Sequence, residues 1–251
     1  MSGPGHLDYL LALADDALVS AQRCAEWVTR APEIEEDIAL ANLGLDLLGQ
    51  ARLLLAHAAT LEGRGRDEDD LAYFREPAEF RNAVLCELPN HDFAFSMARE
   101  LVFSSYQQAL YRRLLDSAGP QLAAVAGKAV KEVTYHREHA TGWVLRLGDG
   151  TAVSHARMQA GLDAVWPYLP ELFDDSWIDP GLLAGQVAVA PSGLAAEVYG
   201  HLGRVLAAAT LTEPVGAPVA AGGRRGRHTA HLEALLAEFH SVARAHPGAV
   251  W

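Results

Sequence analysis

Residues 32–61 read PEIEEDIALANLGLDLLGQARLLLAHAATL, and this segment is the strongest indication of the fold class. Its apolar side chains recur at three- and four-residue steps, which is the period of an α-helix. Pro32 suits a first helical turn, and the acids between Glu33 and Asp37 are favourable at a helix N-terminus because of the helix dipole. The apolar positions cover more than one face, so we expect this helix to be buried between several neighbours.

Similar patterns extend outward in both directions along the chain. A helix is predicted over Tyr9–Val28, and a turn near Ala31 folds it against the first stretch as a hairpin. A second hairpin is predicted from helices over 92–115 and 121–147, joined by a turn at Gly119-Pro120. Further helical pieces are predicted around 71–74, 80–88, 152–172, 192–211 and 229–245, with an extended loop over 211–226.

Two hairpins of long antiparallel helices, joined by a longer connection, are typical of a ferritin-like four-helix bundle. We therefore predict an all-α fold with additional flanking helices. The chain is interpreted as one domain over residues 1–251, with a bundle core over about 5–147 and the flanking helices and C-terminal extension over about 150–251.

Composition narrows the class of protein. The net charge of −12 argues against a nucleic-acid partner, because phosphate neutralisation needs a basic face. Only two cysteines occur, which fits a reducing compartment. The first residues do not form a positively charged segment followed by an apolar one, so we expect no signal peptide. The apolar runs are short, so we expect no membrane span and a cytoplasmic location.

Ferritin-like bundles build di-iron sites from a carboxylate on each of two helices and Glu-x-x-His on the other two. In the first hairpin, Asp16 and Asp46 lie 15 residues before and after Ala31, which places them at the same height. The position three after Asp46 is Gly49, which has no ligand atom. The histidine that the pattern requires is therefore absent.

The second hairpin is degraded in the same way. Glu132 is the natural acid of its second helix, but Tyr135 stands three positions later, and His136 and His139 follow at other spacings. The facing helix has Glu100 as its closest acid, one to two turns away. We predict a bundle without metal whose buried acids pair with basic or hydroxyl side chains. A mononuclear or shifted site of Glu132, His136 and His139 stays open as the alternative.

Residues 222–232 read GGRRGRHTAHL and form the most distinctive polar stretch. Glycines allow close approach of a backbone, and Thr229 can cap the helix that follows. Arg224, Arg225, Arg227 and His228 beside a helix N-terminus predict a site for phosphate or carboxylate. A solvated basic loop, or arginines that pair with this chain's own acids, is an equally weighted alternative.

Four motifs carry a resemblance to a known family. Residues 35–52 contain ExDxALANxGLDLLGQAR, residues 131–136 contain KExxYH, residues 222–232 contain GGxxGxHTxHL, and residues 247–251 contain PGxxW. Together they resemble the C subunits of phenylacetyl-CoA 1,2-epoxidase, a ring-hydroxylating oxygenase, over nearly the whole chain.

The resemblance implies a structural, non-catalytic subunit of a monooxygenase complex in aerobic phenylacetate catabolism. It implies a homologous catalytic A subunit with a di-iron centre, a bridging B subunit, and a reductase E subunit that uses NADPH, FAD and an iron–sulfur centre. No cofactor is expected in this chain, which could form a homodimer when alone. The arginine segment would then contact a partner or CoA. The competing hypothesis is an independent metal-binding ferritin-like enzyme or storage protein with an atypical ligand set.

Overall fold

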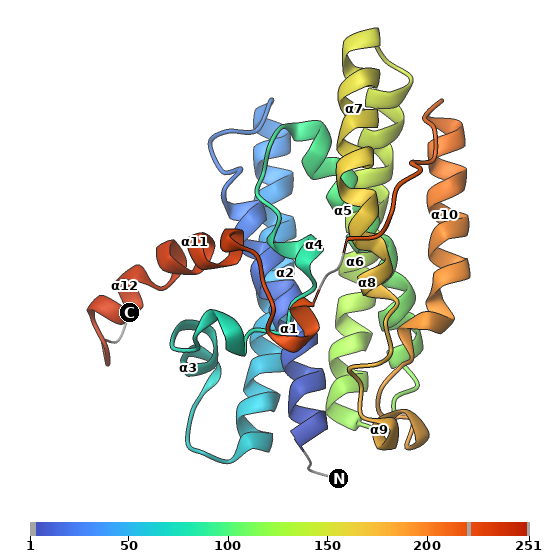
Figure 1. Cartoon of the computed structure of the whole chain (residues 1–251). Coiled ribbons are helices and arrows are strands. Elements are labelled where there is room, and N and C mark those ends of the chain that lie inside the picture. The colour runs from blue at the N-terminus through green and yellow to red at the C-terminus, as the bar shows by residue number, and fades with distance from the viewer. Residues whose placement is uncertain (1–3, 220–221, 250–251) are drawn as a thin grey trace. The chain divides into compact units, whose positions relative to one another are not determined.

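The computed structural model of the chain describes residues 4–219 and 222–249 (Figure 1). These residues form α-helices, short 3-10 helices and loops; among them there is one isolated β-bridge, Gly222–Arg227, and no strand. The predicted all-α fold is confirmed, and both long helical hairpins of the ferritin-like pattern are present. Contacts divide the chain into unit 1, Met1–Pro89 with Ala221–Trp251, and unit 2, Asn90–Ala220. The single-domain interpretation stays a prediction.

The core of unit 1 is the hairpin of α1 (Pro4–Ala25) and α2 (Ile34–Glu62), which pack along each other (Figure 1). α1 ends three residues earlier than predicted, and α2 begins two residues after Pro32. α2 stops at Gly63, whose φ of 67° is the left-handed conformation that glycine adopts without strain.

The remaining elements of unit 1 are short. They include α3 (Glu68–Tyr73), whose first turn is held by a reciprocal capping box between Asp67 and Asp70. As predicted, Thr229 caps the helix after the arginine segment, and its side chain accepts from the backbone N–H of His231. The predicted helix over 229–245 is interrupted at His240. The other elements are η1 (Pro77–Glu79), α4 (Val84–Glu87), η4 (Gly223–Arg225), α11 (Ala230–Phe239) and α12 (Ser241–Ala245).

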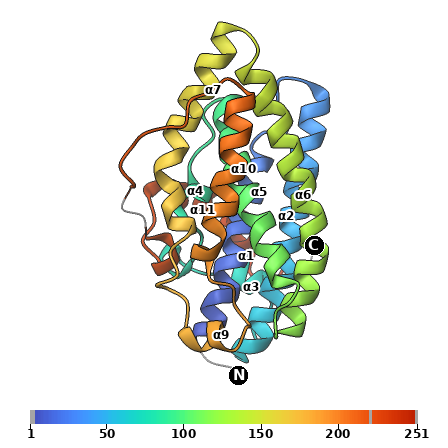
Figure 2. The same ribbon diagram turned by 90° about the vertical axis from the view of Figure 1, so that its right-hand side faces the viewer.

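Unit 2 is built on the hairpin of α5 (Phe93–Leu114) and α6 (Pro120–Gly148), and Figure 2 shows both helices with α10 (Ala195–Ala208). The predicted boundaries hold because local signals fix them. The Asp92 side chain accepts from the backbone N–H of Phe95 at 2.9 Å, and Pro120 lies in the first turn of α6.

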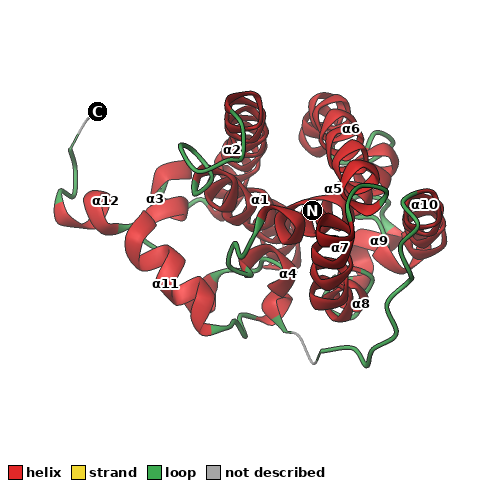
Figure 3. Ribbon diagram, turned by 90° about the horizontal axis from the view of Figure 1, so that it is seen from above, coloured by secondary structure: helices red, strands yellow, loops and turns green. Residues whose placement is uncertain are grey.

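The sequence predictions for unit 2 differ from the structure in three details. The helix predicted over 152–172 is broken into α7 (Ala152–Val165), η2 (Trp166–Tyr168) and α8 (Leu169–Leu172), because Pro167 interrupts the helical hydrogen bonds. The short helix α9 (Pro180–Ala184) was not predicted. The helix predicted over 192–211 corresponds to η3 (Pro191–Leu194) followed by α10. Figure 3 shows these pieces as helices linked by loops.

The expectation that α2 is buried on several sides was also wrong. Its inner positions, such as Leu43 and Leu47, are fully buried, but Ile34 and Leu45 are 73% and 65% exposed. α2 is long and apolar enough to cross a membrane by length and composition alone. That is weak evidence for a span, since core helices of globular proteins pass the same test.

Candidate functional site

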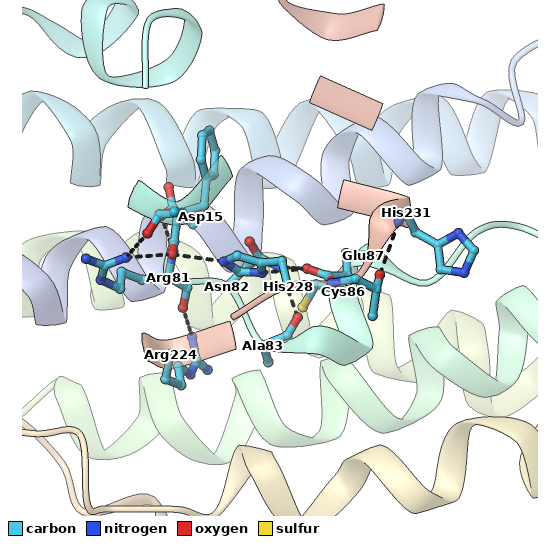
Figure 4. Close-up of polar contacts among 12 residues, drawn as sticks. Asp15, Arg81, Asn82, Ala83, Cys86, Glu87, Arg224, His228 and His231 are labelled. Atoms are coloured by element: carbon cyan, nitrogen blue, oxygen red, sulfur yellow. Dashed lines mark hydrogen bonds and ion pairs between the residues drawn. The ribbon is translucent and has the colours of Figure 1, made fainter. Parts of the chain in front are cut away.

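Six charged or chargeable side chains of unit 1 gather in its interior, and we call them the ionic cluster. Three are acids and three carry or accept a positive charge. Figure 4 shows much of the cluster, with the chain segment before α4 lying between α1 and the turn that contains η4. Its members are Asp15, Asp16, Arg75, Glu87, Arg224 and His228.

Asp15 and Arg75 form the first pair, and both side chains are at most 1% exposed. The guanidinium donates to both carboxylate oxygens, one of them at 2.9 Å, in the bidentate geometry that makes such pairs strong. Asp15 also accepts from the backbone N–H of Arg81 at 2.8 Å. Arg75 lies over the ring of Phe80, 4.1 Å from its centroid. The pair therefore fixes the segment after α3 onto α1.

Asp16 and Arg224 form the second pair, with 2.7 Å between Oδ2 and Nη2. The other carboxylate oxygen accepts from the backbone N–H of Ala83 at 2.8 Å. Arg224 also donates to the carbonyl oxygens of Ala12 and Arg81. Burial raises the pKa of Asp16, and the charge and hydrogen bond of Arg224 offset part of that rise.

Glu87 and His228 form the third pair. Nδ1 of His228 lies 2.7 Å from Oε2 of Glu87, and Nε2 lies 3.0 Å from the carbonyl oxygen of Phe80. A carbonyl oxygen only accepts, and Glu87 already accepts from Asn82 and from the backbone of Thr229. Donation from both ring nitrogens is the arrangement of an imidazolium beside a carboxylate. Burial alone would lower the pKa of His228, but these hydrogen bonds and the charge of Glu87 raise it overall.

The glycines of the arginine segment explain how Arg224 reaches the interior. A Cβ on Gly223 would lie 2.0 Å from the carbonyl oxygen of Asn82, so only glycine lets the two backbones approach so closely. Gly226 has a φ of +70°, and a Cβ there would lie 2.2 Å from the carbonyl oxygen of Ala78. The GGRRG motif is therefore the sequence of a turn seated on residues 78–84.

The structure places the predicted ligand positions of the first hairpin as follows. Asp16 is buried and directed at Arg224 and Ala83, so a guanidinium provides the positive charge that a metal would supply. Asp46 and Gly49 on α2 are only partly buried. The structure therefore brings Asp16 together with the arginine segment.

The second hairpin scatters its predicted positions around α6. Tyr135 is 51% exposed, whereas His136 is fully buried. Glu132 pairs with Lys128 one turn earlier at 3.5 Å, and His139 is partly buried. Within residues 4–219 and 222–249, no three His, Cys, Asp or Glu side chains are close enough to hold one metal ion. Whether the chain is free of metal stays a prediction.

The arginine segment divides into inward and outward residues. Arg224 and His228 point inward and pair with Asp16 and Glu87 in the ionic cluster. For Arg224, the alternative that the arginines pair with the chain's own acids is therefore confirmed. Arg225 and Arg227 are exposed. Contact of this segment with a partner or CoA stays a prediction, and it now concerns these two exposed arginines.

Sequence reasoning missed Asp15, Arg75 and Glu87. The signal for Asp15 was its place beside Asp16 in an apolar stretch, which left two acids in need of partners. Nothing local pointed to Arg75, which is 60 residues away. For Glu87, the only local signal was its apolar context between Cys86 and Leu88.

Two long helical hairpins with degraded ligand positions define an all-α protein of the ferritin-like type. A family model described as phenylacetic acid catabolic protein matches residues 3–251, and the chain belongs to this family. It is 44% identical over 243 residues to the C subunit of the 1,2-phenylacetyl-CoA epoxidase of Escherichia coli (strain K12). That match covers 97% of this chain and 98% of the relative. The resemblance found in the sequence motifs is thereby confirmed.

Proposed function

We propose that this chain is the non-catalytic C subunit of a phenylacetyl-CoA 1,2-epoxidase in aerobic phenylacetate catabolism. The observation that carries the proposal is Asp16, the carboxylate that a di-iron site would take from α1. The guanidinium of Arg224 already neutralises this carboxylate, with 2.7 Å between Nη2 of Arg224 and Oδ2 of Asp16. The identity to the E. coli relative over nearly the whole chain supports the same assignment.

The role that follows is structural. The chain stabilises a catalytic A subunit that holds the di-iron centre, while a B subunit bridges such pairs in the cytoplasm. Electrons reach the A subunit from NADPH through the FAD and iron–sulfur centre of the reductase E subunit. This chain contributes a packed helical body and binds no redox cofactor of its own.

Co-expression with the tagged A subunit tests the proposal. The two chains should co-purify, and epoxidation of phenylacetyl-CoA should require both chains with the reductase. Iron analysis should find about two irons in the pair and far less than one in this chain alone. Stoichiometric iron in the isolated chain, or turnover by it without the A subunit, would overturn the proposal.

A variant of the remaining candidate ligand sharpens the result. Glu132→Gln keeps the side-chain shape and removes the charge that a metal would need. We expect the iron content and turnover of the complex to stay within about twofold of wild type, because Glu132 already pairs with Lys128 at 3.5 Å and is not expected to hold a metal. Loss of iron in this variant would favour the shifted site of Glu132, His136 and His139.

A further inference from the structure

The outer side of α2 carries a line of large apolar side chains exposed to solvent. Ile34, Ile38, Leu45 and Leu48 are 73%, 57%, 65% and 42% exposed. Their spacings of four, seven and three residues place them on one side of the helix. We call these four residues the α2 stripe.

The stripe differs from ordinary surface apolarity. Single exposed aliphatic residues are common on proteins, but a continuous line of them marks an interaction surface. The opposite side of α2 is already packed in the protein interior, since Leu43, Leu47 and Leu54 are fully buried. α2 thus has two apolar sides, and unit 1 covers only the inner one.

A shallow cavity continues the stripe beyond Leu48. It has a volume of about 320 Å³, and Leu48 and Leu55 form its wall on α2. Tyr73 and Phe239 line it as well, with their rings stacked at 4.7 Å. The combination of a helix face and an apolar hollow can receive a partner helix with one protruding side chain.

The charges around this surface are mainly negative. Glu35 lies at one end, and Glu68 and Asp69 line the cavity at the other. Arg52 is the cation of the cavity, and it already pairs with Glu68 at 3.1 Å. Burial raises the pKa of Asp69, and the neighbouring Asp67 and Glu68 raise it further, so an added cation would be stabilising there.

A second copy of the chain does not fit this surface well. Each copy carries a net charge of −12, so self-association would bring together two acidic surfaces. A helix with an apolar face and flanking Lys or Arg side chains complements both the stripe and its acidic ends.

We propose that the α2 stripe and the adjoining cavity are the docking face for a basic-flanked, apolar helix of the catalytic subunit. This inference rests on the proposed function and adds the surface through which the partner binds. Burial of the stripe would provide the affinity, and Glu68 and Asp69 would orient the incoming helix by pairing with its basic side chains.

A pair of matched charge insertions tests the docking face. Leu45→Arg places a cation in the centre of the stripe, and Val153→Arg does the same at an equally exposed aliphatic residue of α7, 64% against 65%. Binding of the purified catalytic subunit is measured by isothermal titration calorimetry. We expect Leu45→Arg to raise the Kd by about tenfold or more, and Val153→Arg to change it by less than about twofold. Thermal melts of both isolated variants should match wild type, because neither side chain is buried.

A second pair tests the charge complementarity. Asp69→Asn should raise the Kd by a few fold, and the difference from wild type should shrink at high salt. Asp163→Asn, an exposed acid on α7, is the control and should leave the Kd unchanged.

The outcomes separate the two levels of the proposal. If wild type binds the catalytic subunit and Leu45→Arg binds equally well, the docking face is wrong while the proposed function stands. Failure of wild type to bind would overturn both. Sedimentation velocity of the isolated chain tests the remaining alternative, in which a second copy of the chain occupies the stripe. If wild type is a dimer that Leu45→Arg dissociates, with partner binding unchanged, the stripe belongs to a second copy and the proposal falls.

Discussion

The first helices of the two hairpins, α1 in unit 1 and α5 in unit 2, both bury polar side chains but satisfy them differently. α1 buries two adjacent aspartates, Asp15 and Asp16. α5 buries Arg99 and Glu100 near its start and otherwise neutral groups, including Ser104, Ser105 and Gln108. One helix thus requires opposite charges, and the other mainly requires hydrogen bonds.

Three of the neutral groups of α5 find partners close by. The hydroxyls of Ser104 and Ser105 donate to the carbonyl oxygens of Glu100 and Leu101, four residues earlier, each at 2.6 Å. The amide of Gln108 donates to Thr134 on the other helix of the same hairpin at 3.1 Å. These three groups are therefore satisfied within the hairpin.

The acids of α1 depend on distant parts of the chain. Arg75 is 60 residues away from Asp15, and Arg224 is 208 residues away from Asp16. An unpaired buried charge is strongly destabilising, so unit 1 requires the turn that contains η4 to be seated. Unit 1 should therefore respond to changes near residue 224 much more than unit 2 does.

The largest expected effect follows removal of Arg224. Arg224→Ala leaves Asp16 buried without its cation, which should destabilise unit 1 by roughly 3–5 kcal/mol. Hydrogen exchange followed by mass spectrometry should show lost protection in peptides from α1 and residues 80–87, and less change in α5 and α6.

Two controls test the cause of that loss. Arg227→Ala alters an exposed arginine three residues away and should cost less than about 0.5 kcal/mol. The double variant Asp16→Leu, Arg224→Met removes both charges and should recover part of the stability. Equal losses for Arg224→Ala and Arg227→Ala would show that the ion pair does not hold unit 1 together.

A smaller effect is expected from the turn itself. Gly223→Ala forces a Cβ to within 2.0 Å of the carbonyl oxygen of Asn82, so the backbone must shift, at a cost of about 1–3 kcal/mol. The matched change Gly203→Ala lies in α10 with nothing within 4 Å, and it should stabilise by up to ~1 kcal/mol. Urea titrations of both variants give the comparison. A Gly223→Ala variant as stable as wild type would mean that the backbones at Gly223 and Asn82 are not tightly packed against each other.

Opposite pH dependences should distinguish the two units. His228 in unit 1 has a raised pKa, so its contribution is complete below about pH 6.5 and is lost as the pH rises through the folded value. Burial, followed by Arg137 and Arg204, lowers the pKa of His201 in unit 2 to about 4. Its contribution is lost as the pH falls from about 6.5 towards 4.

Denaturation measured at several pH values checks this prediction. His228→Gln should lose most stability relative to wild type near pH 6 and least at pH 9, whereas His201→Gln should gain relative to wild type as the pH falls. A difference between wild type and His228→Gln that does not vary with pH would show that folding does not raise the pKa of His228.

Local signals explain how much of the fold could be predicted. Asp92 and Pro120 determine where α5 and α6 begin, and Gly148 lies at the end of α6, so those boundaries were predicted within one residue. Both long hairpins followed from apolar periodicity. The break at Pro167 was visible in the sequence, but the apolar pattern continues across it and hid the end of α7.

The ionic cluster was beyond local reasoning for a physical reason. The sequence shows that Asp16 needs a partner, but other arginines, such as Arg23 and Arg52, lie closer to it along the chain than Arg224 does. The choice depends on two backbones that touch at Gly223, and only the folded chain shows such a contact. The sequence showed that α2 is apolar on more than one side. Periodicity does not show whether the element that packs on the second side belongs to the same chain.

The smallest expected effect is in α5, and it tests the local half of the comparison. Ser105→Ala removes a hydroxyl whose hydrogen bond goes to the carbonyl oxygen of Leu101 in the same helix. That carbonyl is in the helix interior, where it also accepts from the backbone, so no buried group loses its last partner. Alanine also has the higher helix propensity, which offsets part of the lost hydrogen bond. We expect a change within about 1 kcal/mol in a urea titration, with normal exchange protection in α6. A loss as large as that of Arg224→Ala would contradict the distinction between a hairpin whose serine hydroxyls are satisfied locally and one whose buried acids depend on the end of the chain.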